Sequence, residues 1–345
     1  MHPELNFAVL AGVANRELLK SLRLLAKNRQ PTSEYAQPDP RARHAVYGAV
    51  LNDKLRQFQG RGLPLRVPLQ QGLRSRGWRP FHATPELFCQ LVGTTVFDMP
   101  EERFALKSGE VCLMPRGMPH GETVHDVPGA YLTLIVMLWP DGFSLHFGHA
   151  SAAGSVLSDT HDRFRAGYSL LPRHLDEVAR GFHAKDAAAR DYVRGLLVVV
   201  FAEMLRTVRA PDEAVDPLPP LVAGCLDLIQ LELGEIELSV TMLAGRLGCS
   251  ADHLSRLYRQ KTGCSVSETI NQARIEHACA LLENLKLSAG EVAWMSGFSS
   301  QSYFNQVFLS RTGMTPGQYR SAKVSPRRFA SGGILARLSA VAGRR

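Results

Sequence analysis

One sequence pattern occurs twice in the last third of the chain, and it limits the possible fold more than any other feature. Both copies end in aromatic-x-x-[Lys/Arg]-Thr-Gly-x-[Ser/Thr], and their glycines, Gly263 and Gly313, lie 50 positions apart. Each copy also has an earlier glycine, Gly248 or Gly297, four positions after an alanine. A duplication of this length indicates one structural unit that the chain uses twice.

Each copy has the start and stop signals of two helices joined by a tight turn. In the first copy Ser239 and Ser250 can cap successive helices, and Gly248 can adopt the left-handed conformation of the turn between them. In the second copy Ser288 and Glu291 have the spacing of a capping box. These signals predict two helix-turn-helix motifs, in which the second helix can enter the major groove of DNA.

The second helix of each motif has an apolar side for packing and a polar side that we expect to face DNA. Arg256 lies at the centre of the first polar side, where its guanidinium can bind guanine, and Arg259 is placed for a phosphate. The candidate DNA-binding residues are Ser250, Asp252, Ser255, Arg256 and Arg259 in the first motif, and Ser299, Gln301, Ser302, Asn305 and Gln306 in the second.

A helix between the motifs would set their spacing. Ser265 and Glu268 form another capping-box pattern, and the helix that they open is predicted to end near Leu285. About twenty helical residues span about 30 Å, close to the ~34 Å between successive major-groove faces. The two motifs can therefore contact successive groove segments on one side of the duplex. The alternative is an ordinary helical bundle whose polar faces are only solvated.

Residues spread over both motifs and the helix between them match a known domain. They are Leu243, Ala244, Ser250, Leu254, Ser255, Arg256, Leu257, Tyr258, Thr262, Gly263, Arg274, Ile275, Ala278, Leu281, Leu282, Gly297, Phe298, Tyr303, Phe304, Phe308, Gly313, Thr315, Pro316, Tyr319 and Arg320. This set resembles the DNA-binding domain of the AraC/XylS family of bacterial transcription regulators over roughly 100 residues. The resemblance implies that the polar sides of the third and sixth helices contact bases.

Net charge does not by itself identify this domain. The chain has a formal charge of +8, but residues 218–320 contain eight Lys/Arg and nine Asp/Glu. Six further basic residues and no acidic one follow from Ser321 onward. An architectural DNA binder would be strongly basic throughout this domain, so the sequence favours a sequence-specific regulator over that class.

The N-terminal half has a different texture, with short apolar runs separated by turns. The runs span residues 87–92, 94–98, 104–106, 111–114 and 131–138. Their rhythm predicts a small antiparallel barrel or jelly roll between about residues 63 and 139.

Two spacings in this half resemble the sequence motifs of the cupin family. Gly109-x5-Pro115-x-Gly117-x2-His120 resembles the second cupin motif, and His82-x3-Glu86-x6-Gly93 resembles the end of the first. The resemblance implies a cupin-like sensor, which AraC/XylS regulators commonly have. We therefore predict an α+β protein, with a cupin-like N-terminal β-barrel flanked by helices and an all-α C-terminal domain with two helix-turn-helix motifs.

Four residues of this half are candidates for binding an effector: Trp78, His82, Glu86 and His120. The two histidines and the glutamate also make a possible two-histidine, one-carboxylate metal set. The resemblance to metal-binding cupins implies a further histidine two positions before His82, where this chain has Pro80. We therefore expect an effector pocket with no metal and no cofactor. The alternative is a cupin-type metal-dependent enzyme fused to a helical domain.

The predicted organisation has six parts. Helix is predicted from His161 to Val208, and the apolar run Leu196–Phe201 is expected to be buried on all sides, against the barrel or a second copy of the chain. The parts are an N-terminal lead (1–60), the barrel (61–150), a helical connector with a dimerisation role (151–209), a Pro-rich linker (210–220), the double helix-turn-helix domain (221–322) and a basic tail (323–345).

The remaining sequence signals concern location and partners. Six cysteines without a Cys-x-x-Cys pair indicate reduced thiols, and the longest apolar run is too short to span a bilayer. We expect a cytoplasmic regulator without enzymatic activity or membrane association. Its predicted partners are double-stranded promoter DNA, a small-molecule effector, a second copy of the chain and, for an activator, RNA polymerase.

Overall fold

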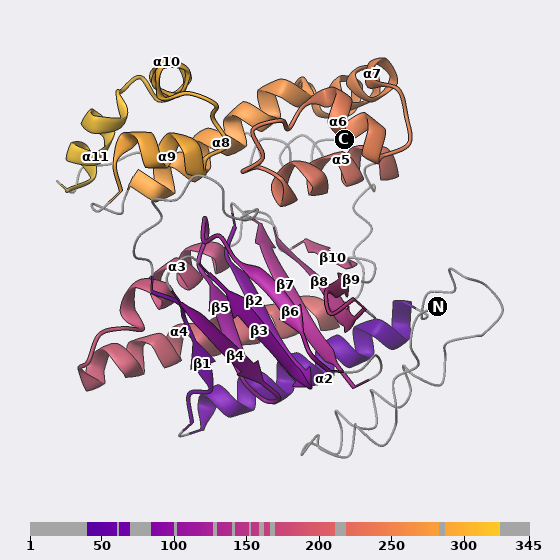
Figure 1. Cartoon of the computed structure of the whole chain (residues 1–345), viewed down its shortest axis with the longest axis vertical. Coiled ribbons are helices and arrows are strands. Elements are labelled where there is room, and N and C mark those ends of the chain that lie inside the picture. The colour runs from indigo at the N-terminus through magenta and orange to yellow at the C-terminus, as the bar shows by residue number, and fades with distance from the viewer. Residues whose placement is uncertain are drawn as a thin grey trace. The chain divides into compact units, whose positions relative to one another are not determined.

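The computed structural model of the chain is drawn in Figure 1. The structure describes residues 40–60, 62–69, 84–99, 102–126, 130–139, 142–151, 153–158, 162–165, 170–210, 219–282 and 287–324. Trp78, Pro80 and His82 lie outside these residues, as do most of the predicted linker and basic tail. The described strands and the first three described helices form one compact unit, and the last seven helices form another.

The first unit contains two β-sheets. Its strands are β1 (Leu65–Arg66), β2 (Glu86–Val92), β3 (Thr94–Asp98), β4 (Arg103–Lys107), β5 (Val111–Met114), β6 (Gly121–Val124), β7 (Leu132–Trp139), β8 (Gly142–Ala150), β9 (Val156–Ser158) and β10 (Asp162–Arg165). Strands β2, β3, β4, β5 and β7 coincide with the five predicted apolar runs, so this part of the prediction is confirmed.

The strand order corrects the predicted barrel. The larger sheet has the order β1-β5-β2-β7-β8-β10, with β9 also paired to β8, and the smaller sheet has the order β4-β3-β6. Strand β1 pairs with β5 in parallel, whereas the other described pairs are antiparallel. Among the described strands no pairing joins the two sheets, so they do not form a closed barrel. The α+β class itself is confirmed.

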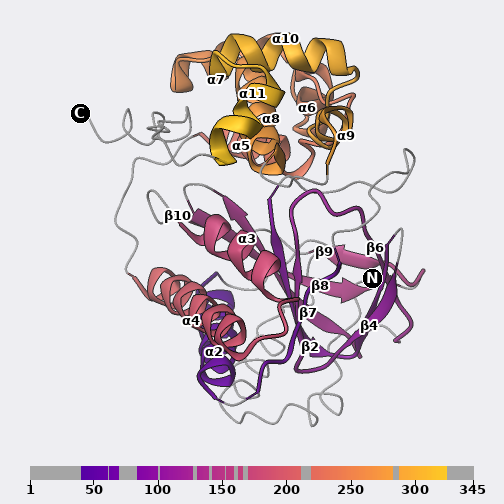
Figure 2. The ribbon, with the colours of Figure 1, turned by 90° about the vertical axis from the view of Figure 1, so that its left-hand side faces the viewer.

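The larger sheet stays open because helices cover one of its faces. On β2, Leu87, Cys89 and Leu91 belong to this face, whereas Phe88 packs against Phe97 and His120 on the other. The Leu87 face packs in one apolar cluster against α2 (Pro40–Gln59), α3 (Leu171–Gly181) and α4 (Ala187–Arg209). Figure 2 shows the three helices on one side of the sheet. Because they remove this face from water, the sheet is stable without closing on itself.

A buried ion pair joins α2 to the β10 edge of the larger sheet. Arg43 donates through Nε and Nη2 to the two carboxylate oxygens of Asp162, at 2.6 and 2.8 Å, and the Tyr47 hydroxyl donates to the same carboxylate at 2.9 Å. The hydrogen bond to Asp162 raises the pKa of Arg43. The prediction of helix from His161 is wrong for residues 162–165, because Asp162 is held opposite Leu145 on β8 and the segment continues the sheet.

Helix α4 packs one side on the sheet and leaves the other exposed. Asp186 caps it by accepting a hydrogen bond from the Ala189 N–H at 2.8 Å. Leu197 and Phe201 are fully buried in the apolar cluster. In contrast, Val199 is 47% exposed and Tyr192 is 54% exposed. Within one chain, the run Leu196–Phe201 is therefore buried on the sheet side only, and burial of Val199 against a second copy stays a prediction.

The second unit is entirely helical in its described residues. Its helices are α5 (Pro220–Leu231), α6 (Val240–Arg246), α7 (Ala251–Thr262), α8 (Val266–Leu282), α9 (Ala289–Met295), α10 (Gln301–Thr312) and α11 (Pro316–Val324). In neither unit does a described helix have both the length and the apolar character that a membrane crossing requires.

The predicted helix caps are confirmed. The hydroxyls of Ser239 and Ser250 accept hydrogen bonds from the backbone N–H groups three residues later, at 3.3 and 3.2 Å. Ser288 and Glu291 form the complete capping box. Ser265 and Glu268 form the reciprocal bonds of another, at 2.8 and 3.2 Å. The predicted spacer is the 17-residue helix α8, which is about 25 Å long. Its predicted end near Leu285 lies outside the described residues.

Candidate nucleic-acid interface

The helices α7 and α10 are equivalent parts of the two motifs. Each has 12 residues, starts after a capping serine and ends at a left-handed glycine, Gly263 with φ 76° or Gly313 with φ 74°. In each, the last threonine donates to the carbonyl four residues earlier, from Thr262 at 2.9 Å and from Thr312 at 2.8 Å. Every residue of α7 therefore has a counterpart 50 positions later in α10.

Both helices bury the same side. Leu254 and Tyr258 on α7 are fully buried, as are their counterparts Phe304 and Phe308 on α10. The Tyr258 hydroxyl donates to Thr269 on α8 at 3.0 Å, which fixes α7 against the spacer. The opposite side of each helix is thereby left for a partner.

All ten predicted DNA-binding residues are exposed. On α7 the exposed side carries Asp252, Ser255, Arg256 and Arg259, and on α10 it carries Gln301, Ser302, Asn305 and Gln306. Ser250 and Ser299 precede the two helices. The structure therefore brings together the predicted residues of each motif on one helix side.

Two residues of this interface were missed by sequence reasoning. Ser300, rather than the predicted Ser299, is the counterpart of Ser250, since its hydroxyl accepts a hydrogen bond from the Tyr303 N–H at 3.2 Å. Leu309 is 47% exposed at the position that corresponds to Arg259. Aligning the two copies residue by residue, rather than by their polar pattern, would have identified both.

The two exposed sides differ in charge. Helix α7 has three basic residues, Arg256, Arg259 and Lys261, whereas α10 has only Arg311. The acidic residue Asp252 lies in the first turn of α7. There a carboxylate is favoured by the partial positive charge of the helix N-terminus. The positive potential available to phosphates is therefore concentrated on α7.

A buried arginine links the first motif to the turn of the second. Arg274 on α8 is 7% exposed and donates to the carbonyl oxygen of Glu235 at 2.7 Å. Its guanidinium also lies 5.8 Å from the ring centroid of Phe298. Next to Phe298, Gly297 has φ 76°, and a Cβ there would lie 2.3 Å from the carbonyl oxygen of Leu233. Only glycine fits this position, so the spacing of the motifs is tightly fixed.

In the first unit, Glu86 and His120 come together as the sequence predicted. His120 Nε2 lies 3.5 Å from a carboxylate oxygen of Glu86 and 3.7 Å from one of Glu122. Burial, followed by the charge of Glu86, raises the pKa of Glu122 to about 8. Sequence reasoning missed Glu122, although residues two apart on a strand share a face. The rings of Phe88 and Phe97 lie 5.9 and 6.1 Å from that of His120.

The other predicted effector residues, Trp78 and His82, are outside the described residues. Within the described ranges, no group of three or more His, Cys, Asp or Glu side chains has an arrangement suited to a metal ion. The part of the candidate site that the structure contains is thus an acid–imidazole cluster beside two aromatic rings.

Comparison with known proteins connects the interface with a family. Residues 243–322, which include both recognition helices, match the model of a helix-turn-helix domain. The chain is 32% identical over 246 residues to the HTH-type transcriptional activator RhaR of Salmonella dublin, and the aligned part is 68% of this chain and 84% of that protein. RhaR of Salmonella typhi is 30% identical with the same coverage.

The chain is also similar to solved DNA-binding domains. The DNA-binding domain of AdpA, a global transcriptional factor solved in complex with a target DNA, is 30% identical, with a TM-score of 0.29 and coverage of 31% of this chain and 96% of that one. The helix-turn-helix model and the extent of the match to RhaR identify the family. The chain belongs to the AraC/XylS family of DNA-binding transcription regulators.

Proposed function

We propose that this protein is an effector-responsive transcription activator that places α7 and α10 in two successive major-groove segments of a promoter in the cytoplasm. The observation that carries the proposal is the pair of equivalent, exposed recognition helices on one spacer, with the second turn tied to the first motif by Arg274. Activation is supported by the relatives, which are described as transcriptional activators. An activator of this kind would also contact RNA polymerase.

Within this proposal the exposed residues have different roles. Arg256 has the central position on α7 and can donate two hydrogen bonds to O6 and N7 of guanine. Arg259 and Lys261, closer to the helix end, would bind phosphates. On α10, Asn305 and Gln306 carry amides, which pair best with adenine. We therefore assign affinity mainly to α7 and sequence discrimination to both helices.

The test is a selection of bound fragments from random DNA by the purified chain, followed by hydroxyl-radical footprinting of the selected site. We expect two protected segments on one side of the duplex, about 10 base pairs apart. Failure to enrich any sequence would contradict specific DNA binding. A single protected segment would contradict the simultaneous use of α7 and α10.

The first unit is proposed to be the sensor, with a cupin-like effector site at Glu86 and His120 that Trp78 and His82 would complete. Its support is the buried polar cluster of Glu86, His120 and Glu122, since buried polar groups beside aromatic rings are typical of ligand sites. Native mass spectrometry of the full chain should detect a co-purified small molecule. A fragment that starts at Leu218 should bind the selected DNA, but its DNA affinity should not change when the small molecule is added. A normal effect of the small molecule on this fragment would remove the sensor role from the first unit.

A homodimer is proposed through the outer side of α4, within the predicted connector. Tyr192 and Val199 are exposed there at a spacing of seven residues, with Gly195 and Ala202 also exposed on the same side. Small residues permit close approach of a second helix, and exposed apolar ones favour its packing. Sedimentation of the full chain should give a dimer, and Val199→Asp should give a monomer. Dimerisation unaffected by Val199→Asp would exclude this surface.

A further inference from the structure

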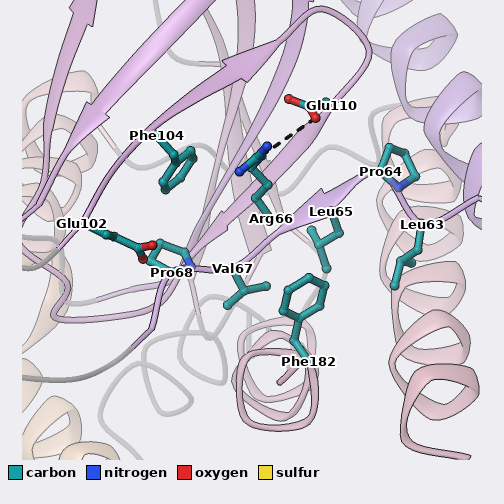
Figure 3. A pocket seen from close by; sticks show the side chains of 10 residues that line it. All are labelled: Leu63, Pro64, Leu65, Arg66, Val67, Pro68, Glu102, Phe104, Glu110 and Phe182. Atoms are coloured by element: carbon teal, nitrogen blue, oxygen red, sulfur yellow. Dashed lines mark ion pairs between the residues drawn. The ribbon is translucent and has the colours of Figure 1, made fainter. Parts of the chain in front are cut away.

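A pocket of about 360 Å³ lies at the β1 edge of the larger sheet (Figure 3). It is formed where the edge strand β1 meets the start of β4, the turn before β5 and the end of α3. Its volume falls within the range of small-molecule sites, which is about 300–1,000 Å³. It contains none of the residues assigned to DNA or to the proposed effector site.

One half of the pocket is apolar. Leu65 and Val67 belong to the helix-covered core of the first unit, and Leu63 and Phe182 pack against that core. Figure 3 shows the Phe182 ring, at the end of α3, on the side of Leu65 and Val67. These side chains form a wall that suits an aromatic or branched aliphatic group.

The other half is organised by Arg66. Its guanidinium carbon lies 5.4 Å from the ring centroid of Phe104, a distance at which the ring attracts a cation. Arg66 Nε lies 3.8 Å from a carboxylate oxygen of Glu110, which is longer than a hydrogen bond. Figure 3 shows the side chain directed toward Glu110. In the described part of the chain this guanidinium makes no hydrogen bond, so its donors are available to a ligand.

Two carboxylates in the pocket are oriented by backbone groups. One oxygen of Glu102 accepts a hydrogen bond from the Leu69 N–H at 3.0 Å. One oxygen of Glu110 accepts from the Lys107 N–H at 2.8 Å. Glu102 therefore has an oriented carboxylate with a second oxygen that can accept from a ligand, whereas the second oxygen of Glu110 faces Arg66. With one guanidinium and two carboxylates, the pocket disfavours a simple anion and suits a ligand that carries both charges.

We infer that this pocket binds a free α-amino acid with an aromatic or branched apolar side chain. The ligand's carboxylate accepts from the Arg66 guanidinium, and its ammonium group donates to Glu102. Its side chain fills the apolar half beside Phe182. Such a ligand needs a cationic hydrogen-bond donor, an oriented carboxylate and an apolar wall. All three line this pocket. The inference does not depend on the proposed DNA-binding or effector roles.

The test measures binding of three probes to the full chain by isothermal titration calorimetry. L-phenylalanine carries both charges, phenethylamine lacks the carboxylate and 3-phenylpropionate lacks the ammonium. We expect saturable 1:1 binding of L-phenylalanine and affinities at least about tenfold lower for the other two. No binding of L-phenylalanine, or equal binding of 3-phenylpropionate, would overturn the inference.

Variants distinguish the two charged contacts. Arg66→Gln should weaken L-phenylalanine and 3-phenylpropionate at least about tenfold without changing phenethylamine, whereas Glu102→Gln should weaken L-phenylalanine and phenethylamine only. Arg103→Gln is the matched control, because Arg103 is 62% exposed beside Asp98 and does not line the pocket. Circular dichroism checks that each variant is folded. Unchanged L-phenylalanine binding in folded Arg66→Gln would overturn the assignment.

Discussion

The two recognition helices share a backbone design and differ in what they present. Helices α7 and α10 have the same length, the same serine cap and the same glycine end, and they bury corresponding side chains. Yet Arg256 and Arg259 on α7 correspond to Gln306 and Leu309 on α10. The difference teaches that one set of residues specifies the helix and another specifies its ligand. After duplication, the second set is free to change because it is exposed.

The largest effect on stability and DNA affinity is expected from removing Arg274, which links the two motifs. Arg274→Ala leaves the carbonyl of Glu235 without its donor and removes a side chain packed on Phe298. The free energy of unfolding should fall by about 2–4 kcal/mol. Affinity for the full DNA site should approach that for a site containing only the α7 segment. Urea unfolding and fluorescence anisotropy measure the two quantities.

Arg246→Ala is the control for this variant. Arg246 also forms an ion pair, with Glu232, but its side chain is 54% exposed. Its loss should change the free energy of unfolding by less than about 1 kcal/mol. Equal losses in the two variants would mean that Arg274 has no special linking role.

The comparison predicts that Arg256 and its counterpart Gln306 both contact bases but with unequal energies. Arg256→Ala should weaken binding to the selected site by about 1–3 kcal/mol and relax the preference at one base pair. Gln306→Ala should have a smaller effect at a different base pair. Binding to a panel of single-base variants of the site measures both. An equal loss for Arg256→Ala on the selected site and on scrambled DNA would instead place this side chain on the backbone.

Exchanging the residues at the next corresponding position should partly equalise the helices. Arg259→Leu should reduce the slope of log affinity against log salt by about one unit, and Leu309→Arg should increase it by about one unit. Salt titrations on selected and scrambled DNA measure the slopes. Arg190→Leu, an exposed change of the same charge in the first unit, is the control. A slope change in this control would show that overall charge, and not the contact, is responsible.

The smallest effect should come from the amide of Asn305. Asn305→Ala should cost about 1 kcal/mol on the selected site through one adenine contact. It should leave binding to scrambled DNA and the salt slope unchanged, because no charge is removed. Its counterpart variant, Ser255→Ala, tests the same position on α7. A salt-slope change for Asn305→Ala would contradict the division of roles between the helices.

Local signals explain what could be predicted from the sequence. The caps at Ser239, Ser250 and Ser288 depend on residues no more than three positions away, and all three are confirmed. The strands β3 and β5 were predicted with their correct ends because an apolar run and its turns are contiguous in sequence. The exposed sides of α7 and α10 follow from helical periodicity alone.

Long-range contacts explain what could not be predicted. Lys54 on α2 is only 2% exposed. Its ammonium can be buried because it donates to the carbonyl oxygen of Gly109 at 2.8 Å, and Gly109 lies 55 residues later in the sequence. The edge of the larger sheet depends on the parallel pairing of Leu65 with Val111. The pocket beside Arg66 depends on Phe182, which no local pattern connects with β1. Each of these features needs a partner that the neighbouring sequence does not contain.

Because Arg274 links the two motifs, α10 can contribute to binding even when its own affinity for DNA is low. Under the proposed function, once α7 is bound, the spacer holds α10 next to a second DNA segment, and the local concentration of α10 is then set by geometry and not by the amount of protein. Tethering of this kind raises overall affinity by about 10²–10⁴ without any new contact, provided both sites can be engaged together. A helix with one basic residue would scarcely bind DNA alone. Held by the spacer α8, the same helix can discriminate between DNA sequences.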